Sequence, residues 1–365
     1  MSTTPSHLPT VWLDALKVLA AQLIVWHHLA LYGPMPEVAY PLAPALIDLL
    51  AGPARLVVQV FLVIGGFLAA EALWRSPGVG GATTWRMLPG LMGRRHVRLA
   101  RPLAVALPAA VLMAWWARAW IGHPSIPAAP DAAQLLAHAL LLQDVLGMEA
   151  LSAGLWYLAI DFQLYALLAV LAAAVGCLPT TPAIRARVGA AGVVGAILGS
   201  LLVWNRDPEL DVWALYFLGS YGLGVLACWA RRGLVARRRA VAVIAVAVAL
   251  ALTLQWRDRI ALAGLVALLL ALAPADAAGR ARQGARAVLA GLSRQSYALF
   301  LIHYSVALGV GAVIGRLWPD ASVAHASGMV LAWLLSMLAA AGLHHGVENR
   351  RRRVAPVLAV RPALV

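Results

Sequence analysis

Long apolar runs separated by short polar segments dominate the hydrophobic pattern of the chain. A helix needs about 20 apolar residues to cross the hydrocarbon core of a bilayer, within a range of about 17–25. By this measure the pattern predicts ten membrane-spanning helices and an all-α integral membrane fold. The predicted spans are residues 11–31, 54–74, 102–120, 156–177, 189–204, 213–230, 240–256, 260–274, 296–315 and 326–345.

One further apolar stretch, residues 134–147, is too short to span and falls in the longest loop on the predicted outer side. We interpret it as an interfacial or re-entrant helix over the bundle. Because no fixed-period repeat is visible, residues 1–346 are expected to form a single polytopic domain. A short basic cytoplasmic tail, residues 347–365, is expected to follow it.

The distribution of arginine predicts the orientation of the spans. With both termini in the cytoplasm, the inner segments hold 22 arginines, and the outer side holds 5, counting Arg118 at the outer end of the span 102–120. Cytoplasmic loops of membrane proteins are enriched in Lys and Arg. We therefore expect both termini to be cytoplasmic and the protein to be a multi-pass component of the inner (plasma) membrane. The predicted inner segments are residues 75–101, 178–188, 231–239, 275–295 and those after 345.

Composition excludes a soluble protein, because hydrophobic residues make up 62% of the chain and charged residues 12%, against roughly 45–50% and about 25% in soluble domains. The net charge of +14 follows from the inner loops. No nucleic-acid-reading motif accompanies it, so no nucleic-acid partner is expected. Cys177 and Cys228 form no disulfide or zinc pattern. No histidine pair has metal-type spacing with open ligands, so neither a metal nor a permanently bound cofactor is predicted.

Ionisable residues inside the predicted spans are the first candidates for function. Each costs about 2.5–3.5 kcal/mol at mid-helix on insertion scales, and such residues usually face the interior of the bundle. Arg55 and Glu71 lie near span ends, from which their side chains can reach water. The candidates are Asp14, Lys17, His27, His28, Arg55, Glu71, Asp161 and His303.

The first span places two of these residues on one helical face. Lys17, the only lysine of the chain, precedes His28 by 11 residues, which is about three turns and roughly 16 Å of helix. Asp14 lies one turn before Lys17 and can pair with it. His27 is rotated by roughly 100° from His28. A paired lysine and a hydrogen-bonded core histidine would also explain the pattern, but a cation and an imidazole on one stripe favour a functional site.

The segment LDALKVLAAQLIVWHH resembles the first span of the membrane acyltransferase-3 family, whose signature is an arginine, ten residues and a histidine. Lys17 and His28 fall on those two positions. Later segments match other family blocks in the same order, with Gly65 for a serine, Asp161 for a glutamate and Phe300 for a tyrosine. These segments are VFLVIGGFLAAEALW at 60–74, RRHVRLARP at 94–102, LWYLAIDFQLY at 155–165, SRQSYALFLIHYSVAL at 293–308 and VEN at 347–349.

The resemblance implies an activity and its substrates. Members of the family transfer an acyl group, often acetyl, from a cytoplasmic coenzyme A thioester to a hydroxyl of a carbohydrate or similar, also lipid-linked, acceptor at the membrane. A hydroxyl needs a general base at hydrogen-bond distance, and imidazole has an ordinary pKa near 6.5. We expect His28 to be that base, although an acyl-histidine intermediate is the alternative.

The basic block is expected to bind the phosphates of acyl-CoA through Arg94, Arg95 and Arg98. Ordinary enrichment of arginine in inner loops would also explain this block, and only the resemblance favours phosphate binding. Lys17 lies between the predicted inner surface and His28, where it can hold a phosphate or the thioester region. We therefore count Lys17 with the catalytic residues.

Asp161 has Tyr157 and Tyr165 one turn away on either side, on one helical face. We expect it to act in catalysis by orienting the acceptor or an imidazole; pairing with Arg55 is the alternative. His303 is expected to be a second functional imidazole or a hydrogen-bonding link between helices. The remaining predicted substrate-binding residues are Trp156, Tyr165, Ser296 and Tyr297.

Two other classes of function stay open at this point. A transporter or exporter would use the same intramembrane charges as a substrate path, although the internal repeats common in transporters are not visible. A structural partner of a polysaccharide assembly complex would retain the charges without activity. The sequence does not name the acceptor, the acyl chain length or the oligomeric state.

Overall fold

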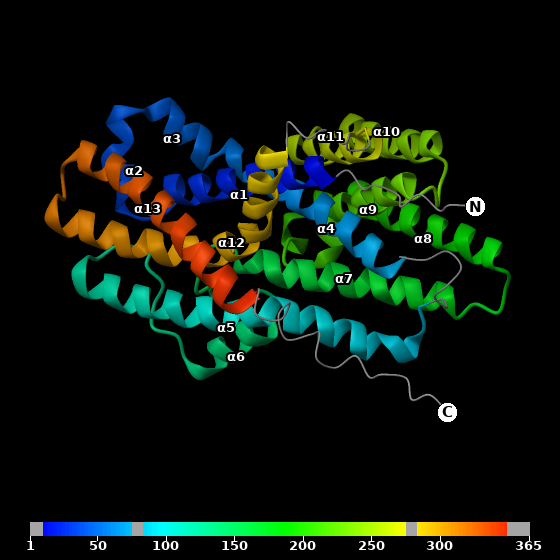
Figure 1. The fold of residues 1–365 in the computed structure, drawn as a ribbon, viewed down its shortest axis with the longest axis horizontal. Helices are drawn as coiled ribbons and strands as arrows, with labels where there is room; N and C mark the ends of the chain where they lie inside the picture. Colours follow the sequence, from blue (N-terminus) through cyan, green and yellow to red (C-terminus); the bar gives the residue numbers. More distant parts are fainter. Residues whose placement is uncertain (1–9, 75–82, 275–282, 349–365) are drawn as a thin grey trace.

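The computed structural model describes residues 10–74, 83–274 and 283–348, which form helices and no strand. Most of the long helices run along the longest axis of the molecule (Figure 1). The helices are α1 Thr10–Leu31, α2 Pro34–Ala39, α3 Pro44–Ala51, α4 Val58–Leu73, α5 Leu88–Trp120, α6 Ala132–Leu140, α7 Leu155–Gly176, α8 Pro182–Leu202, α9 Ala214–Arg231, α10 Arg237–Leu254, α11 Asp258–Leu272, α12 Gln283–Leu317 and α13 Ser322–Leu343, followed by a short π-helix His344–Glu348.

The all-α membrane fold is confirmed, and each predicted span coincides with a helix of 15 residues or more. Within the described ranges six helical segments are long and apolar enough to cross a membrane, and a seventh counts if α1 and the helix after it, bent by 80°, form one span. α9 is rich in Gly and Tyr, α10 begins with three arginines, and α11 has only 15 residues. The full count of ten spans therefore stays a prediction.

Two helices are much longer than the spans predicted from hydropathy. α5 begins 14 residues before the predicted start at residue 102 and includes the basic block, and α12 begins at Gln283 instead of residue 296. Backbone hydrogen bonds continue a helix through polar residues once its apolar part is formed. Hydropathy marks only the part of a helix that is compatible with lipid, so it missed these polar turns.

The predicted short helix at 134–147 is found as α6, but it ends earlier. The side chain of Asp131 caps its start by accepting a hydrogen bond from the backbone N–H of Gln134 at 2.7 Å. The helix stops at Leu140, because Leu141 adopts a left-handed conformation with φ 60°. Its location at the membrane interface stays a prediction, as does the basic tail, which lies outside the described residues from position 349 onward.

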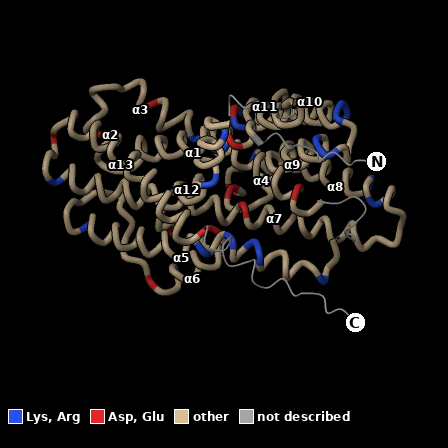
Figure 2. Tube along the Cα trace, in the orientation of Figure 1, with Lys and Arg blue, Asp and Glu red and all other residues tan. Residues whose placement is uncertain are grey.

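The helices form two groups that meet along α1, α4, α5 and α7. α12 packs against α1, α5 and α13, whereas α9 packs against α4, α7, α8, α10 and α11. The groups touch where α1 contacts α4 and α5 contacts α7. Figure 2 shows acidic and basic residues gathered near this junction in the centre of the molecule. Charge inside the bundle is therefore concentrated between the two groups.

Glycines allow α4 and α9 to cross in direct backbone contact. A Cβ atom at Gly66 would lie 1.8 Å from the carbonyl oxygen of Tyr221, and one at Gly224 would lie 1.9 Å from the carbonyl oxygen of Val63. Only glycine permits so close an approach. The backbone of Tyr221 is consequently held against α4, which is the helix that carries Gly65.

Candidate active site

A cavity of about 600 Å³ lies where the two groups of helices meet. It is lined by the C-terminal end of α1, the N-terminal ends of α4 and α7, the start of α9 and part of α12. His28 stands on its wall, together with aromatic side chains. The aromatic residues that line the cavity are Tyr32, Phe61, Trp156, Tyr157, Tyr216, Phe217 and Phe300.

Two of the predicted histidines meet at this wall. Nδ1 of His28 on α1 lies 2.7 Å from Nε2 of His303 on α12, and the two rings stack with centroids 5.0 Å apart at an angle of 11°. Only 7% of His28 and 1% of His303 is exposed. The predicted hydrogen-bonding link between helices is thus observed, and it joins His303 to the predicted base.

The hydrogen bonds of His303 determine which nitrogen of His28 carries a proton. Nδ1 of His303 lies 3.1 Å from the carbonyl oxygen of Leu299, which can only accept, so this nitrogen carries the proton. Nε2 of the neutral His303 ring then accepts, and Nδ1–H of His28 donates to it. Nε2 of His28 is left with a free lone pair, which is the state that a general base requires.

His27 also lines the cavity, although its rotation from His28 was expected to direct it elsewhere. Its Nδ1–H donates to the carbonyl oxygen of Leu50 at 2.9 Å, so it is fixed to α3. The two rings lie 5.1 Å apart. The cavity is wide enough to be lined by both His27 and His28 near the C-terminal end of α1. The angle between the two residues on the helix does not reveal the width of the cavity. What distinguishes the two histidines is the ring of His303, which among the described contacts is bonded to His28 and not to His27.

Asp161 pairs with Arg95, not with Arg55 as one prediction had it. Nη2 of Arg95 on α5 donates to Oδ2 of Asp161 on α7 at 2.5 Å, and the guanidinium lies 5.0 Å from the ring centroid of Tyr165. Arg55 instead lies on the cavity wall. The ion pair is largely buried, with side-chain exposures of 16% for Arg95 and 7% for Asp161. It bridges the two groups of helices.

Lys17 lies at the other end of α1, among basic residues of α5. The positive charge of Arg98 repels its ammonium group, and the negative charge of Asp14 attracts it. The positive charge of Arg95 in turn repels Arg98. Asp14 also accepts a hydrogen bond from the hydroxyl of Ser293 at 2.5 Å, which ties α1 to α12. Arg94 and Arg98 are exposed, so their charges are open to an anionic ligand.

Comparison with known proteins decides the family of this chain. A family model described as an acyltransferase domain matches residues 10–343. The chain belongs to the acyltransferase-3 family. Comparison with curated proteins and with solved structures yields no match. The family match and the apolar helices together make the protein a membrane acyltransferase.

The acyltransferase places its other predicted substrate-binding residues at different distances from the cavity. Trp156 lines the cavity, whereas Tyr165 lies outside its lining and packs its ring against the guanidinium of Arg95. Ser296 donates its hydroxyl hydrogen to the carbonyl oxygen of Leu292 on its own helix at 3.2 Å. Tyr297 donates to the carbonyl oxygen of Leu99 at 2.9 Å and so ties α12 to α5. The roles of these residues in substrate binding stay predictions.

Sequence reasoning missed Tyr221 and most of the charged rim of the cavity. Tyr221 is only 1% exposed and lies beside the Arg95–Asp161 pair. A lone tyrosine in an apolar run gives no signal beyond packing. The charged rim consists of Arg55, Asp144, Asp211 and Arg259. Arg55 was a candidate and Asp144 falls in the predicted stretch 134–147, but Asp211 and Arg259 fall between predicted spans.

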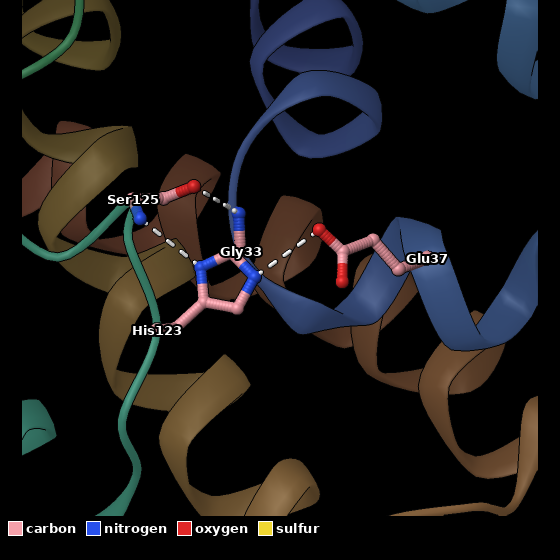
Figure 3. Close-up of polar contacts among 4 residues, drawn as sticks. All are labelled: Gly33, Glu37, His123 and Ser125. Atoms are coloured by element: carbon pink, nitrogen blue, oxygen red, sulfur yellow. Dashed lines mark hydrogen bonds and ion pairs between the residues drawn. The ribbon is translucent and has the colours of Figure 1, made fainter.

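A small hydrogen-bonded cluster holds the corner after α1 in the acyltransferase (Figure 3). The backbone N–H of Gly33 donates to Oγ of Ser125 at 3.1 Å, and the N–H of Ser125 donates to Nδ1 of His123 at 3.1 Å. Nε2–H of His123 therefore donates to Glu37, at 3.2 Å. The cluster fixes the turn beside Tyr32, whose ring lies 5.6 Å from that of His28.

Proposed function

We propose that this acyltransferase moves an acyl group, acetyl in the simplest case, from acyl-CoA on the cytoplasmic side to a hydroxyl of a carbohydrate or similar cell-envelope acceptor. The observation that carries the proposal is the free Nε2 lone pair of His28, which the bond to His303 leaves on a buried histidine at the cavity wall. In this proposal the enzyme lies in the inner membrane, with His28 as the general base.

The reaction needs Nε2 of His28, the acceptor hydroxyl and the thioester carbonyl carbon to be aligned. The acceptor hydroxyl donates its hydrogen to Nε2 of His28 while its oxygen attacks the thioester carbonyl carbon. The carbon–sulfur bond then breaks, and the thiolate of coenzyme A takes up the proton from His28. His303 keeps the ring of His28 in one orientation and one tautomer through both steps, which preserves the alignment of the reacting atoms.

The cavity suits a carbohydrate acceptor. Aromatic faces such as that of Trp156 offer apolar surface to a sugar ring, while a few polar groups fix its orientation. Asp144 and Asp211 on the rim can accept hydrogen bonds from hydroxyls. Burial raises the pKa of the Asp144 carboxyl, and the nearby carboxylate of Asp211 raises it further. Arg55 and Arg259 on the same rim can donate hydrogen bonds to the acceptor.

The donor would bind at the opposite end of α1. Coenzyme A carries several phosphate charges, and Lys17, Arg94 and Arg98 bring positive charge to one place. Charged hydrogen bonds to phosphate are stronger than neutral ones. Arg95 is already paired with Asp161, so we assign the phosphates to its neighbours and give Arg95 a separate role below.

Arg98→Ala is expected to raise the Kd for acetyl-CoA about ten-fold or more, because one charged hydrogen bond contributes about 1.5–3 kcal/mol. The Kd is measured by titration calorimetry on purified protein in detergent. Arg187→Ala is the matched control, since Arg187 is another exposed arginine of the predicted inner side. Equal Kd values for wild type, Arg98→Ala and Arg187→Ala would mean that these arginines only orient the protein in the membrane.

The proposal includes ten spans with both termini in the cytoplasm, supported by the distribution of arginine. In a background lacking the exposed Cys177, a cysteine replacing Thr83 should resist an impermeant maleimide in intact cells. A cysteine replacing the exposed Asp320, between α12 and α13, should be labelled. Ready labelling at position 83 and protection at 320 would reverse the orientation.

A further inference from the structure

Two buried hydrogen-bond donors at the Arg95–Asp161 pair lack an acceptor. The hydroxyl of Tyr221 and Nε of Arg95 are both buried, and neither has a hydrogen-bond partner among the described residues. Tyr221 is 1% exposed. Leaving a donor buried and unpaired costs stability, so proteins rarely keep two such groups together unless a bound molecule satisfies them.

The two donors lie at one small region between α4, α5, α7 and α9. A Cβ atom at Gly65 would be 3.1 Å from Cε2 of Tyr221 and 3.4 Å from Oδ1 of Asp161, so the tyrosine ring and the carboxylate converge on a position without a side chain. Asp161 in turn holds Nη2 of Arg95. Because Gly66 rests on the carbonyl oxygen of Tyr221, the tyrosine has a fixed location.

This region lies between the cavity and the basic residues assigned to the donor. Phe61 and Tyr157 line the cavity, and Gly65 and Asp161 follow them by one helical turn, about 6 Å deeper. On the side of this region that faces away from the cavity, Arg98 is close enough to Arg95 for their positive charges to repel each other. For a donor bound at Arg98, Arg95 and Tyr221 therefore lie between its phosphates and the cavity that holds His28.

We propose that the hydroxyl of Tyr221 and Nε–H of Arg95 bind an amide carbonyl oxygen of the pantetheine arm of acyl-CoA. The assignment rests on the proposed function. Two neighbouring donors match an oxygen that only accepts hydrogen bonds, and the arm is the part of coenzyme A that carries neutral carbonyl groups between the phosphates and the thioester. Asp161 orients Arg95 for this contact, and its negative charge compensates the positive charge of the guanidinium.

Three aromatic rings lie between this contact and His28. The ring of Phe300 is 6.3 Å from that of Phe61 and 5.7 Å from that of Tyr157, centroid to centroid. Phe300 also packs against Gly154, where a Cβ atom would lie 2.7 Å from its ring. The acyl end of the arm therefore passes these rings, while the amide carbonyl stays one turn below them with Tyr221 and Arg95.

The test is Tyr221→Phe, which removes the hydroxyl and keeps the ring. We expect the Kd for acetyl-CoA to rise about two- to ten-fold, the effect of one neutral hydrogen bond. The Kd for adenosine 3′,5′-bisphosphate, which has the phosphates but no arm, should stay unchanged, whereas Arg98→Ala weakens both. Because the hydroxyl has no described protein partner, the Tm of the unliganded variant should stay the same or rise.

Tyr304→Phe is the matched control, because its buried hydroxyl donates to the carbonyl oxygen of Ser125 at 2.5 Å. This control should lower the Tm and leave both Kd values unchanged. An unchanged Kd for acetyl-CoA in Tyr221→Phe, or a Tm lowered as in the control, would overturn the proposed contact while leaving the proposed function in place. A wild-type protein that binds no acetyl-CoA would overturn both.

Discussion

His28→Ala is expected to lower the rate of acyl transfer by about 10²–10⁴-fold, the usual contribution of a general base. Among the residues that the structure describes, the variant removes the only cavity-lining imidazole that a second histidine holds in a fixed tautomer. His27→Ala should retain most of the activity. Its Nδ1–H is bonded to the backbone of α3, and its ring has no bond to His303 among the described contacts.

The measurement is acyl transfer from labelled acetyl-CoA to envelope extract by purified variants in liposomes, with gel filtration as the check on folding. His27→Ala is the matched control, because both residues lie on the last turn of α1 and are similarly buried. If His27→Ala is inactive while His28→Ala stays active, the base has been assigned to the wrong histidine. If both stay active, the mechanism assigned to this helix is wrong, and a group other than these two histidines must act as the base.

Asp161→Ala is expected to destabilise the protein by about 3–5 kcal/mol, because it leaves the charge of Arg95 buried without a partner. The double variant Arg95→Met, Asp161→Leu should recover most of that loss, since apolar residues of similar volume can replace a buried ion pair. Both side chains are largely buried and come from different groups of helices.

Thermal unfolding in detergent measures this effect, with the wild type, Arg95→Met, Asp161→Leu and the double variant forming one cycle, and with Asp161→Ala measured beside them. A double variant as unstable as Asp161→Ala would contradict the view that the unpaired charge causes the loss. The double variant should still bind acetyl-CoA more weakly than the wild type, because it also lacks Nε–H of Arg95.

The helices could be predicted from the sequence because hydropathy and helix length are local properties. The part of the site that lies on a single helix could be predicted for the same reason. Lys17 and His28 lie on one continuous helix at the expected spacing. The extension of α5 through the basic block was missed, because polar turns of a long helix leave no hydropathic signal.

Contacts between distant segments could not be predicted in the same way. Asp161 finds Arg95 because α5 packs on α7, a pairing that no local pattern specifies. Tyr221 gave no signal for the same reason, since its neighbours come from α4, α5 and α7. His303 was a candidate, but its bond to His28 depends on how α12 packs against α1.

The central claim is best tested by mass spectrometry of cell-envelope glycans. Glycans from a strain lacking this protein should lose an ester-linked acyl mass that the wild-type strain carries. Wild-type protein should restore that mass, and an equally abundant His28→Ala variant should not. The mass and the glycan that carries it would name the acyl group and the acceptor. Unchanged glycans in the deletion strain, or full restoration by His28→Ala, would contradict the account.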